Sequence, residues 1–99
     1  MNLRTVKKDV EYFVNEFIND AFISISFSED EEKKSGIVEL VNKALDLRDD
    51  TIRKINNPDK TEKKRAYYNN VMQELFSGLD AMYTELSRET RANGKGQTA

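Results

Sequence analysis

The feature that most constrains the fold is a ladder of large apolar residues in the last third of the chain. These residues follow one another at alternating steps of four and three, which keeps them on one face of a helix for about five turns. Such a face is typical of a helix that packs along its whole length against other helices. The ladder consists of Tyr68, Met72, Leu75, Leu79, Met82 and Leu86, and it is flanked by Val71, Phe76 and Tyr83.

The composition also favours long helices over a sheet. Apolar residues make up 37% of the 99 residues and charged residues 34%, with only four Gly and one Pro. A sheet of this size needs more turn residues and more β-branched residues than this chain provides. The formal charge of −2 exerts no global pull towards nucleic acid or acidic lipid. No apolar run approaches the ~18 residues that span a membrane, and no signal peptide is evident, so we expect a cytoplasmic protein that does not bind a membrane.

The first helix is predicted over about residues 2–26. The segment 23–28 also alternates between apolar and polar residues, as a strand would. Helix is favoured because Phe22 and Ile25 continue the apolar arc and no second strand exists for pairing. The arc contains Leu3, Val6, Val10, Phe13, Val14, Phe17, Ile18, Ala21, Phe22 and Ile25.

The second helix is predicted over about residues 29–56. A Ser-Glu-Asp-Glu motif at residues 28–31 predicts a capping box, in which Ser28 caps the helix and Glu31 reaches back. The alternative is that residues 28–34 form an acidic loop and that the helix begins at Ser35. The apolar arc contains Ile37, Val38, Leu40, Val41, Ala44, Leu45, Leu47, Ile52 and Ile55.

The third helix is predicted over about residues 58–92, with Asn57 as its cap and Pro58 at its first position. Gly94 ends it, and residues 93–99 are expected to be a disordered polar tail. Short connections make neighbouring helices antiparallel, so the chain is predicted to form one all-α domain over residues 1–92, an up-down-up three-helix bundle. In that bundle Gly36 lies level with Gly78, which either allows a close approach of two backbones or has no packing consequence.

Residues that could carry chemistry are scarce. The chain has no His and no Cys, which excludes the usual nucleophile, base and thiolate metal sites. The carboxylates of residues 29–32 could hold Mg²⁺ or Ca²⁺, but they lack the ligand spacing of an EF-hand and suit a solvated helix start better. We therefore predict no catalytic site, no metal site and no cofactor, and an enzyme is the third hypothesis.

Arg48 is the one charged residue near the centre of an apolar arc. It is expected to bond a carboxylate or to stack on Tyr67 or Tyr68. The sharper alternative is that it binds an anion at the bundle end where basic residues gather. Binding of nucleic acid or another anion at this end is the second hypothesis for function. Its candidate residues are Arg48, Arg53, Lys60, Lys63, Lys64 and Arg65.

Three large residues of the first helix point away from its apolar arc. Tyr12 and Ile23 are eleven residues apart, which is three helical turns, and Phe27 lies close to the same stripe. Single exposed apolar residues are ordinary, but three on one helix favour a contact surface. The leading hypothesis is therefore a small non-enzymatic helical interaction module that binds a protein partner or forms a homodimer.

Overall fold

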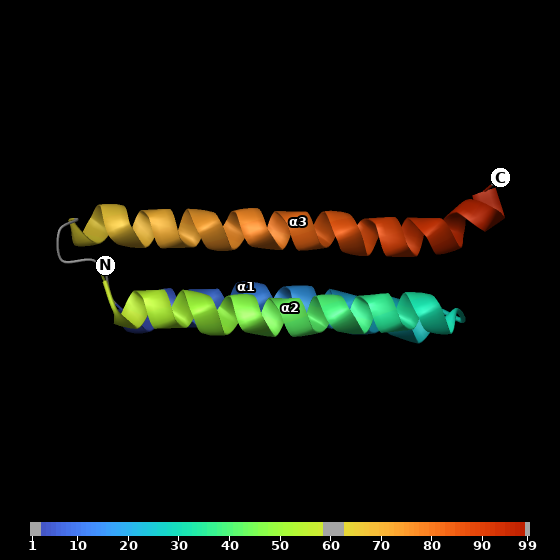
Figure 1. Cartoon of the computed structure of the whole chain (residues 1–99), viewed down its shortest axis with the longest axis horizontal. Helices are drawn as coiled ribbons and strands as arrows, with labels where there is room; N and C mark the ends of the chain where they lie inside the picture. Colours follow the sequence, from blue (N-terminus) through green and yellow to red (C-terminus); the bar gives the residue numbers. More distant parts are fainter. Residues whose placement is uncertain (1–2, 59–62, 99) are drawn as a thin grey trace.

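The protein is a bundle of three long helices, which confirms the predicted all-α, up-down-up architecture (Figure 1). The computed structural model describes the backbone of residues 3–58 and 63–98, and the side chains of residues 4–58 and 63–89. Helix α1 spans Leu3–Phe27, α2 spans Glu31–Asn56 and α3 spans Lys64–Thr98. The bundle is 53 Å long. Figure 1 shows α1 behind α2, with α3 running along both of them.

The core consists of one apolar stripe from each helix. The ladder of α3 is buried throughout, except that Met72 is partly exposed. It packs against Val10, Val14 and Phe17 of α1 and against a matching stripe on α2, which includes Ile37, Ala44 and Ile55. Burying one such aliphatic side chain stabilises the fold by about 1.5–3 kcal/mol. The 3.6-residue period of the sequence therefore predicted most of the core, with Phe22 of α1 and Val38 of α2 as exposed exceptions.

The turn between α1 and α2 differs from both interpretations of the sequence. Asp30, rather than Ser28, is the N-cap of α2, and its Oδ1 accepts a hydrogen bond of 2.9 Å from the amide of Glu32. Ser28 is buried in the chain reversal, where its amide donates to the carbonyl of Ile25 and its hydroxyl accepts from the amide of Asp30. A carboxylate is the stronger acceptor for helix amides. The predicted Ser28 cap is therefore wrong, and so is a loop as far as residue 34.

The connection between α2 and α3 is longer than predicted. Asn57 ends α2: its amide donates to the carbonyls of Arg53 and Lys54, and its side chain donates to Arg53 O over 2.9 Å. The Tyr67 hydroxyl also donates to Lys54 O. These bonds satisfy carbonyls that a helix end leaves without partners. The prediction that Asn57 and Pro58 begin the third helix is therefore wrong, since α3 begins at Lys64; residues 59–62 lie outside the described residues.

The longer connection changes the pairing of α2 with α3. Gly36 faces the Glu89 carboxylate, and Gly78 faces Leu47, whose Cδ2 would lie 3.0 Å from a Cβ added at Gly78. The two glycines are therefore not at one level, and the predicted close approach between them is wrong. Gly78 instead makes room for a leucine of the neighbouring helix.

The end of α3 also differs from the prediction. The helix continues past Gly94 to Thr98, whereas the sequence placed its end near Ala92 and a disordered tail beyond it. Helical hydrogen bonds are local, so a helix can extend without tertiary partners, although each Gly costs about 1 kcal/mol relative to Ala. Ala99 lies outside the described residues.

Candidate protein interface on α1

The three residues of the predicted contact stripe all lie at the surface of α1. Tyr12 is 59% exposed, Ile23 is 55% exposed and Phe27 is 82% exposed. The core-facing stripe of the same helix, which includes Val14 and Phe17, is fully buried. The structure therefore places the predicted stripe on the side of α1 that neither α2 nor α3 covers.

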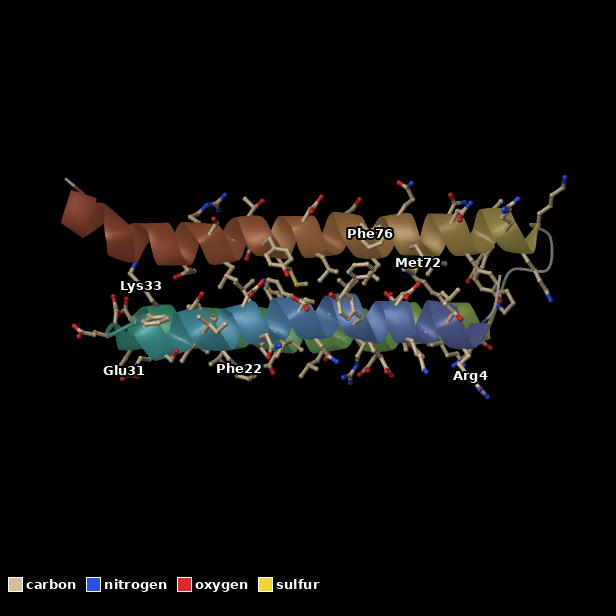
Figure 2. All side chains as sticks on the ribbon, turned by 180° about the vertical axis from the view of Figure 1, so that it is seen from behind. Arg4, Phe22, Glu31, Lys33, Met72 and Phe76 are labelled. Atoms are coloured by element: carbon tan, nitrogen blue, oxygen red, sulfur yellow. The ribbon has the colours of Figure 1, made fainter. Side chains whose placement is uncertain are left out.

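Phe22 joins this surface, although the sequence placed it in the core. Its side chain is 54% exposed, and Figure 2 shows it on the side of the α1–α2 layer away from α3. Ala21, its neighbour, takes the buried position instead. An apolar arc of half the circumference is wider than the strip of α1 that two neighbouring helices cover, so a residue at its edge stays in solvent. Val38 of α2 and Phe76 of α3 are also more exposed than the sequence predicted, at 46% and 43%.

The surface around these residues is mainly uncharged, with the exposed carboxylates of Glu11, Glu16 and Asp20 within one helical turn of it. From Tyr12, helical steps of three and four lead to Asn15, Asn19, Phe22 and Ser26, and Ile23 lies beside Phe22. We call this surface the outer face of α1. Its members, all exposed, are Tyr12, Asn15, Asn19, Phe22, Ile23, Ser26 and Phe27. In a chain of which 34% is charged, this face gathers four large apolar side chains, Tyr12, Phe22, Ile23 and Phe27, with the Glu16 carboxylate between them.

The side of α1 that faces α3 is closed by aromatic contacts, and these reach the outer face, since the Tyr12 ring meets Phe13 edge to face with centroids 5.4 Å apart. The ring of Phe13 meets Phe76 edge to face, with centroids 5.1 Å apart, and Phe17 meets Tyr83 in the same way at 5.0 Å. The Tyr83 hydroxyl donates to Asp20 over 3.2 Å. Partial burial and the nearby Asp20 carboxylate raise the pKa of Tyr83 to about 12. The exposed part of Phe76 therefore belongs to a packed seam rather than to a separate surface.

Acidic neighbours pair with most of the predicted anion-binding residues on α2. Arg48 donates from its Nε and its second terminal nitrogen to Asp49 Oδ1, at 3.2 and 3.0 Å, so the expected bond to a carboxylate is present. Arg53 pairs with Asp50. The basic end of the molecule thus carries its own counter-charges on the surface of α2.

Lys54 ties this end of α2 to α3. Its ammonium lies 3.2 Å from Asp50 Oδ2 and 3.5 Å from Glu74 Oε2. The hydrogen bond between Lys54 and Asp50 lowers the pKa of the aspartate and raises the pKa of the lysine. At this end of the molecule Lys63 precedes α3 and Lys64 and Arg65 begin it, all three exposed, and Lys60 lies outside the described residues.

The described part of the chain offers little that resembles a catalytic pocket. An open depression is lined by Glu11 of α1 and by Arg48, Asp49, Ile52, Arg53, Asn56 and Asn57. Its two arginines are already paired, with Asp49 and Asp50. Residues 3–58 and 63–98 contain no cluster of three side chains suited to a metal ion. Within the same residues, no helix contains an apolar stretch long enough to cross a membrane.

Comparisons of the chain with protein-family models, curated proteins and solved structures find no match.

Proposed function

We propose that the protein is a non-enzymatic helical interaction module that binds a protein partner through the outer face of α1. The observation that carries this proposal is the exposure of Tyr12, Phe22, Ile23 and Phe27 together on one helix side. The folded bundle has its own core and leaves these side chains in water. Aromatic residues are the type enriched at protein interfaces, and contact with a second protein would remove their apolar area from water.

The basic end supports binding of nucleic acid less well. Arg48, Arg53 and Lys54 are bonded to Asp49 and Asp50, so a phosphate would have to displace carboxylates already in place. Nucleic-acid affinity depends on basic residues that can replace the counterions of phosphates. We therefore expect no retention on heparin at moderate salt. Retention that is lost when Lys63, Lys64 and Arg65 are changed to Glu would favour nucleic-acid or anion binding instead.

The proposal is tested with a double variant, Tyr12→Glu with Ile23→Glu. Two carboxylates on the outer face of α1 would be buried without partners in an interface, which is costly, whereas in the free protein they would face water. The matched control is Ser77→Glu with Ala81→Glu, which places the same charges on exposed positions of α3.

Two measurements decide the outcome. Light scattering at about 100 μM detects self-association with a micromolar dissociation constant, and affinity capture from lysate detects other protein partners. We expect the wild type and the control to self-associate or to capture a partner, and we expect the α1 variant to do neither. The helical circular dichroism of both variants should match that of the wild type. A monomeric wild type whose captured proteins are the same as those of the α1 variant would overturn the proposal.

A further inference from the structure

The two ends of the bundle carry opposite charge. At the end with the α1–α2 turn, Glu29, Asp30, Glu31 and Glu32 are all exposed. At the other end lie the exposed Lys8 of α1 and the exposed basic residues that begin α3. Figure 2 labels Glu31 at one end of the molecule, together with Lys33, and Arg4 at the other end. The outer face of α1 runs between the two ends. The direction in which a partner binds along α1 therefore determines which of its charged groups lie beside each end.

Followed from either end, α1 presents a similar order of exposed residue types, so an antiparallel copy could pair like with like. From one end α1 presents Lys8, Tyr12 and Asn15, and from the other end Ser26, Phe22 and Asn19, all exposed; the same register places Ile23 beside Glu11. An antiparallel copy of α1 would bring an aromatic opposite an aromatic, and an amide opposite an amide. We propose that the partner of the outer face is a second copy of this chain, with the two α1 helices antiparallel about a two-fold axis. This inference rests on the proposed function, because it uses the same surface.

The pairing follows from the spacing. When Tyr12 of one copy lies beside Phe22 of the second, Asn15 lies beside Asn19 and Lys8 lies beside Ser26. The same contacts recur on both sides of the axis, as a two-fold interface requires. Facing Asn amides can donate to and accept from each other, and a polar Asn within an apolar helix seam is known to fix the register of paired helices.

Charge favours the antiparallel arrangement over the parallel one. Two parallel copies would place the acidic turns beside each other and the Lys8 side chains beside each other, and like charges across an interface oppose association. In the antiparallel pair, Glu29–Glu32 of each copy approach the basic start of the other α1. Phe27, the most exposed apolar residue, then lies near Lys8 of the second copy, and an ammonium group over an aromatic ring is favourable.

Cross-linking between single cysteines tests the orientation, and the native chain contributes no cysteine of its own. The two variants are Lys8→Cys and Ser26→Cys, both at exposed positions. A disulfide requires Cα atoms within about 7 Å. In the antiparallel dimer, position 8 meets position 26, whereas identical positions are about 27 Å apart along the axis, at about 1.5 Å per residue. Lys43→Cys, on an exposed part of α2, mixed with Ser26→Cys is the matched control.

We expect disulfide dimers when Lys8→Cys and Ser26→Cys are mixed, and none from either variant alone or from the control mixture. Association of the wild type should weaken as salt is raised from about 0.05 M to about 0.5 M, since screening reduces the attraction between unlike ends. Cross-linking of Ser26→Cys with itself would show a parallel pair and overturn the inference. A wild type that stays monomeric at about 100 μM would also overturn the inference. The proposed function would still stand if the wild type captures a different protein and the variant Tyr12→Glu with Ile23→Glu does not.

Discussion

The outer faces of α1 and α3 occupy equivalent positions in the bundle, yet they carry very different side chains. Both faces look into solvent. The face of α1 presents Tyr12, Phe22, Ile23 and Phe27, whereas that of α3 presents small, polar and charged residues, namely Ala66, Gln73, Ser77, Asp80, Ala81, Thr84 and Arg88, all exposed. Among the described side chains of α3, the one large apolar residue that is exposed, Phe76, packs on Phe13. The contrast between the two faces supports the proposed contact surface on α1.

The largest expected effect contrasts the inner and outer sides of α3. Leu79 is 5% exposed at the centre of the ladder, and Leu79→Ala should lower the free energy of unfolding by about 2–4 kcal/mol, because it leaves a cavity in the core. Ala81→Ser, on the outer side of the same helix turn, should change it by less than about 0.5 kcal/mol. Urea unfolding measures both. If the two substitutions lower the free energy of unfolding equally, Leu79 is no more important to the core than Ala81.

The next effect compares the two outer faces directly. Phe22→Ser should weaken dimerisation by about thirtyfold, which corresponds to a hot-spot loss of about 2 kcal/mol. It should shift the urea midpoint little, since the side chain is already half in water. Equilibrium sedimentation gives the dissociation constant. If Phe22→Ser instead lowers the stability of the monomer as much as Leu79→Ala does, Phe22 serves the core and the contrast with α3 fails.

A smaller effect concerns the turn that connects the outer face of α1 to α2. Asp30→Ala removes the acceptor for the Glu32 amide and should lower the free energy of unfolding by about 1 kcal/mol. Ser28→Thr keeps the hydroxyl and should cost less. Thermal unfolding followed by circular dichroism compares the two variants. A larger loss in Ser28→Thr would indicate that the buried serine, rather than the aspartate, controls this turn.

The smallest effect tests the seam that separates the two outer faces. The folded pKa of Tyr83 is about 12, above the ordinary value of 10.0. Its contribution to stability is therefore complete below pH 10 and is lost as the pH rises through about 12. Absorbance of tyrosinate should show one tyrosine ionising near pH 12, and Tyr83→Phe should remove that step. Complete ionisation by pH 11 in the folded wild type would show that Tyr83 is solvated.

Features with a regular period were predictable from the sequence, whereas features that depend on a connection were not. The ladder from Tyr68 to Leu86 is buried as its spacing required, and α2 ends at Asn56 as expected. Asn57 and Pro58 suit the end of one helix as well as the start of the next, so the sequence could not decide between them. The pairing of α2 with α3 depends on that choice, which is why Gly36 and Gly78 were placed at one level.

The candidate interface was predicted in part for a similar reason. Tyr12, Ile23 and Phe27 fall outside the apolar arc of α1, so periodicity alone identifies them. Phe22 falls at the edge of the arc, and its exposure depends on how closely α2 approaches α1, which no local pattern specifies. The acidic partners of Arg48 and Arg53 were nearer than expected, on α2 itself. The sequence could have indicated these pairs, because Asp49 is adjacent to Arg48 and Asp50 lies three residues before Arg53 on the same helix.

The short turn formed by residues 28–30 has a consequence for the order of folding. Because α1 and α2 are joined by so few residues, their contacts are local and should form early, whereas α3 must close a longer connection before it docks. We expect Leu79→Ala to speed unfolding with little effect on the folding rate, which stopped-flow kinetics can measure. The whole outer face of α1 belongs to this early hairpin. The outer face of α1 is therefore expected to be complete before the last helix docks.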